Sequence, residues 1–266
     1  MNRFGYYDPT SVQKAVGIAS DKRDAMYLAG GQSLLATMKL GLAEPSDLID
    51  LAQIPDLRGI RVEGDGKAIT IGAMTRHAEV AASHEVGARI PAIANLASLI
   101  GDKQVQNRGT LGGSIANNDP AADWPAAVLA LNATVYTNRR KIAADEFFTG
   151  YYTTALDEAE LITSVSFPVP KRAAYMKFRQ PASRFALVGV FVAQAGSGVR
   201  VAVTGAGNRG VFRAKALEDA LAKNWGADAF KSIAIAASEM QGDLHASAEY
   251  RAHLVNVMTR RAVAAA

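Results

Sequence analysis

The sequence has no cysteine among its 266 residues. This absence excludes disulfide bonds, a cysteine nucleophile, and iron–sulfur or zinc sites ligated by cysteine within this chain. The only histidines are His77, His84, His245 and His253, and no two of them are four residues apart. Because helical metal sites commonly use that spacing, we expect ordinary core or surface histidines and no metal site.

Long apolar runs and a strong charge of either sign are also missing. Without an apolar run long enough to span a bilayer, and with no apolar signal-peptide core after Met1, the chain is predicted to be cytoplasmic. The formal net charge is only +4, and the basic residues are scattered. No basic stripe with interleaved aromatic residues appears, so nucleic-acid binding is not expected. Hydrophobic residues make up 49% of the chain, which predicts a globular protein with a substantial core.

The pattern of apolar residues and turn signals predicts an α+β fold. We expect helices at about 11–20, from after Ser33 to about Leu40, and at about 76–83, 91–100, 122–131, 213–223, 227–238 and 247–262. We expect strands at about 25–28, 47–51, 59–62, 68–73, 133–137, 161–167, 174–180, 187–194 and 199–204. The proline-rich segment 168–172 is predicted to link two domains.

The first feature that indicates chemistry is a pair of glycines between a strand and a helix, in Ala29-Gly30-Gly31-Gln32-Ser33. Glycines let backbone N–H groups approach an anion closely and adopt positive φ. The helix that follows adds unpaired donors, and Ser33 suits an N-cap or a hydroxyl donor. The segment could hold a pyrophosphate without a cationic side chain, although a simple tight turn explains it as well.

A second glycine segment, Asn107 to Asp123, is denser in polar groups. It contains Thr110-Leu111-Gly112-Gly113-Ser114, three amides and two carboxylates. Such a stretch offers little to a core and many donors and acceptors to phosphate and ribose, although a long surface loop is the alternative. We expect 107–119 to be irregular. Together the two segments predict a long ligand with a diphosphate centre.

The two segments in this order resemble the FAD-binding medium subunit of the molybdenum hydroxylases, a family that includes xanthine dehydrogenase and aerobic carbon monoxide dehydrogenase. The resemblance extends over nearly the whole chain. It includes Ile71-Gly72-Ala73-Met74-Thr75, Asn107-Arg108-Gly109-Thr110, Asp119-Pro120, Glu160-Leu161-Ile162-Thr163, and, near the end, Ala248-Glu249-Tyr250-Arg251 and Arg260-Arg261-Ala262-Val263. The C-terminal motifs look most like the medium chain of carbon monoxide dehydrogenase.

The resemblance implies a fold and a domain organisation. It implies a two-lobed FAD-binding domain of the PCMH type at 1–170, with lobes at about 1–52 and 53–170. A small α+β domain at 171–266 follows, with an antiparallel sheet and helices, and FAD would lie extended between the two lobes.

The resemblance also implies roles for individual residues. The pyrophosphate would be held by Ala29, Gly30, Gly31, Gln32 and Ser33 and by Thr110, Leu111, Gly112, Gly113 and Ser114. Asn117 and Asp123 would hold polar parts of the adenosine half. Ile162 would pack near the isoalloxazine, and Lys177 matches a basic position near the flavin. Asp123 has a plainer explanation as a charge at a helix N-terminus, Ile162 as part of a strand core, and Lys177 as a surface lysine.

Three positions need separate comment. The family often has Arg at the position of Gln106 and Asp at the position of Arg184. The second change puts a charge of opposite sign near the proposed flavin edge and leaves the flavin potential and the electron acceptor in doubt. Residues Gly205 to Gly210 formally match the dinucleotide fingerprint G-x-G-x-x-G. No second parallel strand ending in an acidic residue follows, so we predict a turn there.

No nucleophile, acid–base pair or metal site is apparent, so no catalytic residue is predicted in this chain. The resemblance implies an electron-transfer subunit whose FAD takes electrons from two [2Fe-2S] clusters of a small partner and passes them to an external acceptor. Substrate would be oxidised at the molybdenum cofactor of a large partner, in a heterotrimer that could dimerise. The alternative is a free-standing FAD-dependent oxidase or reductase. The sequence does not distinguish carbon monoxide, purine, aldehyde or N-heterocycle as substrate, or NAD, quinone or oxygen as acceptor.

Overall fold

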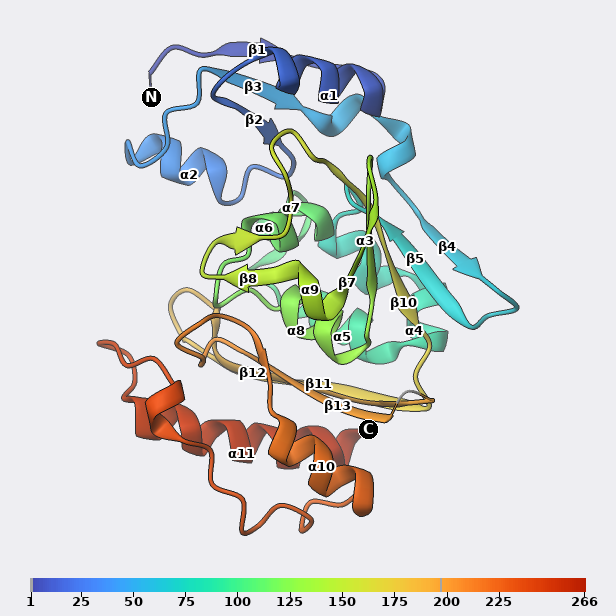
Figure 1. Cartoon of the computed structure of the whole chain (residues 1–266), viewed down its shortest axis with the longest axis vertical. Helices are drawn as coiled ribbons and strands as arrows, with labels where there is room; N and C mark the ends of the chain where they lie inside the picture. Colours follow the sequence, from blue (N-terminus) through green and yellow to red (C-terminus); the bar gives the residue numbers. More distant parts are fainter. Residues whose placement is uncertain (1, 197) are drawn as a thin grey trace.

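The computed structural model describes residues 2–196 and 198–266. Met1, which the predicted first lobe includes, lies outside the described residues. Figure 1 shows three stacked units: an N-terminal lobe, a central lobe, and a C-terminal unit in which a sheet lies above two helices. The α+β fold class predicted from the sequence is confirmed.

The N-terminal lobe is a small parallel sheet with one helix along it and one beside it. Its strands are β1 (Gly5–Tyr7), β2 (Ala25–Leu28) and β3 (Asp47–Asp50), in the order β1-β3-β2. Helix α1 (Val12–Asp21) begins at Ser11, whose side chain accepts from the Lys14 backbone N–H. Helix α2 (Leu34–Lys39) follows the first glycine segment, so β2 and α2 present that segment at the edge of the lobe.

The central lobe combines an antiparallel sheet with a group of short helices. The sheet has the order β4-β5-β10-β6-β7, formed by Ile60–Glu63, Ala68–Gly72, Ile162–Pro168, Thr134–Thr137 and Lys141–Ala143. The helices are α3 (His77–Ala82), α4 (His84–Arg89), α5 (Pro91–Ser98), α6 (Lys103–Gln106), α7 (Leu111–Asn117), α8 (Trp124–Ala130) and α9 (Ala144–Phe147). Two 3₁₀ turns, Leu51–Gln53 and Pro55–Leu57, lead into the lobe, and a small hairpin pairs β8 (Phe148–Gly150) with β9 (Thr153–Thr154).

The C-terminal unit is an antiparallel sheet of order β11-β12-β13-β14, formed by Arg172–Arg179, Ala186–Ala195, Gly198–Thr204 and Phe212–Arg213. Helices α10 (Lys215–Lys223) and α11 (Ala248–Ala265), with a 3₁₀ turn at Ala237–Glu239, cover one face. The helices of the central lobe cover the other face (Figure 1).

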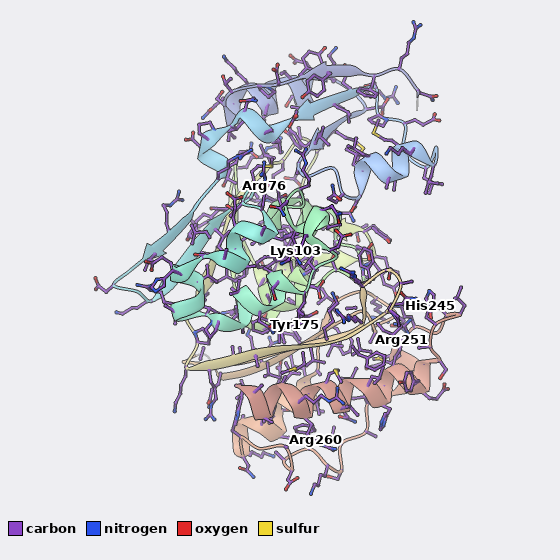
Figure 2. All side chains as sticks on the ribbon, turned by 180° about the vertical axis from the view of Figure 1, so that it is seen from behind. Arg76, Lys103, Tyr175, His245, Arg251 and Arg260 are labelled. Atoms are coloured by element: carbon purple, nitrogen blue, oxygen red, sulfur yellow. The ribbon has the colours of Figure 1, made fainter. Side chains whose placement is uncertain are left out.

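Strand β12 is buried on both faces, and its side chains divide between two cores. Successive side chains of a strand point to opposite faces. Val188, Val190 and Val192 join the core beneath α10 and α11, whereas Phe191 and Ala193 join the core of the central lobe. The sheet therefore separates the core of the central lobe from the core of the C-terminal unit and contributes side chains to both. Figure 2 shows Tyr175 on the side of the central helices and Arg251 among the C-terminal elements.

The prediction that 107–119 is irregular is wrong, because α7 forms within it. Thr110 caps the helix by accepting from the Gly113 N–H, and Asn118 ends it in a left-handed conformation with φ of 45°. Glycine has a low helix propensity, but a Cβ at Gly112 would lie 2.6 Å from the Ala73 Cβ. Close tertiary packing therefore requires glycine in this helix and outweighs its propensity.

The predicted helix at 227–238 is also wrong, because this segment is irregular up to the 3₁₀ turn at Ala237–Glu239. Ile233 and Ile235 are both partly buried against the C-terminal core. Buried residues two positions apart are typical of an extended chain. The helix was predicted because the segment is rich in alanine.

The match to G-x-G-x-x-G is a turn, as predicted. Strand β13 ends at Thr204, and the chain returns through the antiparallel strand β14 before α10 begins. The Gly205 N–H donates to the Pro120 carbonyl, so the turn supports the second glycine segment. Separately, across residues 2–196 and 198–266 no helix has both the length and the apolar character needed to cross a membrane.

Candidate functional site: a cleft between two glycine segments

A cleft of about 630 Å³ opens between the N-terminal and central lobes and is bounded by the β11–β12 turn of the C-terminal unit. This volume is within the range of about 300–1,000 Å³ typical of small-molecule sites. The cleft brings together most residues that the sequence singled out, namely Ala29, Gly30, Gly31, Gln32, Ser33, Thr110, Gly112, Gly113, Ser114, Asn117, Asp123 and Ile162.

The first glycine segment offers free backbone donors. Among the described residues, the N–H groups of Gly30, Gly31, Gln32 and Ser33 find no hydrogen-bond acceptor within the chain. Gly31 has a φ of +71°, and Ser33 begins α2 without a side-chain cap bond. Unpaired backbone N–H groups that line a cleft are suited to an anion such as a diphosphate.

The second glycine segment uses its donors internally. The Leu111 N–H donates to the Thr75 carbonyl at 3.2 Å, and the Gly112 N–H donates to the Ala73 carbonyl at 2.8 Å. The Gly113 N–H donates to Thr110 Oγ1 at 3.1 Å. This segment therefore forms a fixed wall of the cleft, and its polar contribution comes from hydroxyls such as that of Ser114.

The two glycine segments touch each other. A Cβ at Gly30 would lie 2.2 Å from the Arg108 carbonyl oxygen and 2.7 Å from the Gly109 Cα. A Cβ at Gly113 would lie 3.2 Å from the Ala29 Cβ. Glycine at these positions lets the N-terminal lobe meet the central lobe closely enough to form one continuous cradle.

Leu111 and Lys177 lie behind the cleft and do not line it. Leu111 belongs to the core of the central lobe. The Lys177 Nζ donates to Asp123 Oδ2 at 3.0 Å and to the Leu99 carbonyl at 3.1 Å. A basic side chain in this position acts on the cleft through Asp123.

Asp123 joins the cleft wall to the C-terminal sheet. Its carboxylate accepts from the Tyr175 hydroxyl as well as from Lys177, and it does not cap α8. Burial raises the pKa of the Asp123 carboxyl, and the Lys177 ammonium and Tyr175 hydroxyl oppose that increase. The predicted contact of Asp123 with a ligand stays a prediction, and the structure adds a second role in fixing the domain interface.

Gln106 and Arg184 are the two positions that depart from the family pattern. The side chains of both donate hydrogen bonds to backbone carbonyls of the segment 98–101, next to the cleft. The buried Gln106 Nε2 donates to the carbonyls of Ser98 and Ile100. Arg184 lines the cleft in a left-handed conformation with φ of 63°, and its Nη1 donates to the Gly101 carbonyl at 3.3 Å. The β11–β12 turn therefore reaches across to the central lobe and places a positive charge at the cleft.

The sequence did not predict a contact between the two lobes, in which the loop Asp157–Leu161 of the central lobe meets Tyr27 of the N-terminal lobe. Within this loop Ala159 has a φ of 55°, and its carbonyl accepts from the Tyr27 hydroxyl at 3.0 Å. Burial raises the pKa of Tyr27 to about 12, so the hydroxyl stays protonated and donates. The partners are 132 residues apart in sequence, and only the packing of the N-terminal lobe against this loop brings them together.

Glu160 anchors the same loop. Its carboxylate accepts from Arg140 Nε at 3.0 Å, from the Thr137 hydroxyl at 2.7 Å and from the Asp157 N–H at 2.9 Å. Burial by itself raises the pKa of Glu160, but the hydrogen bonds from these groups outweigh it and lower the pKa to about 2. The carboxylate is therefore ionised at all ordinary pH values.

The Glu160 anchor predicts a pH dependence of stability. Because its pKa is lower in the folded chain, its contribution is complete above the ordinary value of 4.5 and is lost as pH falls towards about 2. Glu160→Gln should therefore lower the melting temperature at pH 7, and the difference from the native chain should shrink below pH 4.5. Calorimetry of both chains between pH 7 and pH 2 measures this, and a difference independent of pH would contradict it.

Comparison with known families finds two matches that together include nearly all of the chain. The family described as FAD binding domain in molybdopterin dehydrogenase matches residues 2–170. The family described as CO dehydrogenase flavoprotein C-terminal domain matches residues 173–266.

Individual proteins give the same result. The carbon monoxide dehydrogenase medium chain of Hydrogenophaga pseudoflava is 38% identical, over 99% of this chain and 97% of its own length. The nicotine 6-hydroxylase medium subunit of Paenarthrobacter nicotinovorans is 38% identical, over 97% of this chain and 95% of its own. Among solved structures, the reconstituted CO dehydrogenase from Oligotropha carboxidovorans superimposes with a TM-score of 0.90 at 34% identity, covering 99% of this chain and 97% of that one.

Proposed function

Because this chain belongs to the family of FAD-binding domains in molybdopterin dehydrogenases, we propose that it transfers electrons from the iron–sulfur clusters of a partner to an external acceptor. Its relatives are the medium FAD subunits of molybdenum hydroxylases such as carbon monoxide dehydrogenase. We also propose the division into a FAD-binding domain at 1–170, with lobes at about 1–52 and 53–170, and a C-terminal domain at 171–266.

The observation that supports this function best is that Gly30 to Ser33, whose N–H groups have no acceptor among the described residues, line a cleft together with the second glycine segment. These residues fit a dinucleotide, because backbone donors can hold a diphosphate where a side chain would block its approach. Ala29 to Ser33 would hold the diphosphate with the free N–H groups of this segment, against the wall formed by the second segment, where Thr110, Gly112, Gly113 and Ser114 line the cleft and Leu111 lies behind it. Asn117 and Asp123 would hold the adenosine half.

The remaining cleft residues would orient the flavin and exclude water. FAD, when bound, supplies the chemistry that accepts electrons one at a time and releases them in pairs. Ile162, the first residue of β10, gives the cleft a buried apolar surface suited to a planar ring. Lys177 fixes the Asp123 carboxylate, and Arg184 contributes positive charge at the cleft, favouring an acceptor with anionic groups.

The FAD content of the purified protein tests the proposal. We expect about one FAD per chain, held non-covalently, because the chain has no cysteine for covalent attachment. Acid precipitation should release all of the flavin into the supernatant, where its absorbance is measured. A colourless protein that takes up no FAD would refute the proposed function, and flavin that stays in the pellet would refute non-covalent binding.

We propose that this chain works in the cytoplasm with a small subunit carrying [2Fe-2S] clusters and a large subunit carrying the molybdenum cofactor. The chain has no cysteine to ligate such clusters, so its electrons must come from elsewhere. Native mass spectrometry of the complex from the source cell should show a heterotrimer or a dimer of heterotrimers. A flavoprotein that oxidises substrate without partners would instead support the free-standing oxidase.

A further inference from the structure

We propose that His77 is a positioning residue of the cleft, which donates a hydrogen bond from Nε2 to the diphosphate of the bound dinucleotide and is held in that role by Trp124. This inference rests on the proposed function, since it assigns one contact of the same ligand. It concerns a residue that no motif in the sequence distinguishes.

The tautomer of His77 is set by Trp124. The Trp124 Nε1–H donates to His77 Nδ1 at 3.1 Å, and both side chains are buried. An indole N–H can only donate, so Nδ1 must be the unprotonated nitrogen. In the neutral ring the proton is therefore on Nε2, on the opposite side from Trp124.

The ring is also uncharged. Burial lowers the pKa of His77 to about 4, so the imidazole is neutral at physiological pH. His77 thus presents a single N–H of fixed direction and no charge. Such a donor can contact a phosphate oxygen without the cost of burying a cation.

The location of Nε2 identifies the part of the ligand that it meets. A Cβ at Gly109 would lie 2.7 Å from His77 Nε2, and the His77 backbone N–H donates to the Gly109 carbonyl at 3.0 Å. Gly109 also contacts the first glycine segment, since a Cβ at Gly30 would lie 2.7 Å from the Gly109 Cα. His77 lines the cleft, so its Nε2 lies where the two glycine segments meet, beside the free N–H groups of the first segment.

The Nε2–H also has no acceptor within residues 2–196 and 198–266. Nε2 is not among the fully buried polar atoms without a partner in the described residues, and His77 lines the cleft, so this donor is open to a group that enters the cleft. An oxygen of a ligand in the cleft is the acceptor that this arrangement suits. The diphosphate is the part of a dinucleotide that the adjacent glycine segments accommodate.

The test measures binding of FAD and of ADP to the deflavinated full-length chain by titration calorimetry. His77→Leu should weaken both ligands about tenfold, because it removes one hydrogen bond to an anion. His77→Gln, which keeps an N–H donor, should recover most of the lost affinity. Wild-type affinity in His77→Leu, or the same loss in His77→Gln, would overturn the proposal.

Nitrogen-15 NMR of the histidine-labelled native chain gives an answer that does not depend on a variant folding. We expect the His77 Nε2–H signal to move downfield and to become protected from solvent exchange when FAD or ADP binds. Trp124→Phe should allow the second tautomer to appear. An unchanged Nε2–H signal on binding would overturn the proposal, whereas a native chain that binds neither ligand would refute the proposed function itself.

Discussion

Replacing Gly30 by alanine is expected to leave the purified protein with less than about a tenth of the native FAD content, since overpacking typically costs about 1–3 kcal/mol or more. The new Cβ would lie 2.2 Å from the Arg108 carbonyl oxygen, which is backbone and cannot move aside as a side chain can. The two glycine segments would have to separate, and the cradle for the diphosphate would widen. Flavin absorbance relative to protein absorbance at 280 nm measures the effect.

Gly87→Ala is the matched control, because it makes the same substitution within α4 where a Cβ would meet nothing within 4 Å. Alanine also favours helix over glycine there, so this variant should keep its FAD and its stability. Circular dichroism should show that both variants remain folded. A folded Gly30→Ala chain with native flavin content would show that the diphosphate is not held between these segments.

Lys177→Met is expected to destabilise the chain by about 3–5 kcal/mol, the usual cost of leaving a buried charge without its partner. The Lys177 Nζ lies 2.9 Å from Asp123 Oδ1, and the two side chains are only 2% and 5% exposed. Methionine has a similar shape but cannot compensate the Asp123 carboxylate. Denaturant unfolding followed by tryptophan fluorescence measures the change, since Trp124, which follows Asp123 in the sequence, is fully buried in the central core.

Lys231→Met provides the control for this substitution. The Lys231–Asp228 pair has a similar distance of 2.8 Å, but its side chains are 65% and 76% exposed. Solvent already screens such a pair, so the unfolding midpoint should not change. The double variant Asp123→Leu with Lys177→Met should recover much of the lost stability, because it removes both buried charges. Equal effects of the two single lysine variants would show that burial of the Asp123–Lys177 pair is unimportant.

The sequence was sufficient to predict most main elements and to single out the two glycine segments that line the cleft, because these depend on local signals. Paired glycines between a strand and a helix identify a close backbone approach wherever the rest of the chain lies. The apolar run that forms β12 likewise depends on neighbouring residues. Predicted strands such as 25–28 therefore agree with the structure.

The features that could not be predicted depend on contacts between distant segments. His77 and Trp124 are 47 residues apart, and Tyr27 and Ala159 are 132 residues apart. No spacing or composition links such pairs. The same reason explains the missed helix α7, since the contact of Gly112 with Ala73 outweighs its own propensity. The resemblance predicted Lys177 near the flavin, and only the packing shows that Asp123 lies between Lys177 and the cleft.

The sheet β11–β14 contributes side chains to two cores, one on each face, and this restricts which chimeras with related subunits can fold. A chimera joined within the linker Val169–Lys171 would import β12 with Phe191 facing a foreign central lobe and Val190 facing its own α11. A crossover at this boundary keeps each secondary-structure element intact but divides one core between two parents. After exchange of residues 173–266, positions 175 and 191 should therefore be changed back to the residues of the parent that supplies α8.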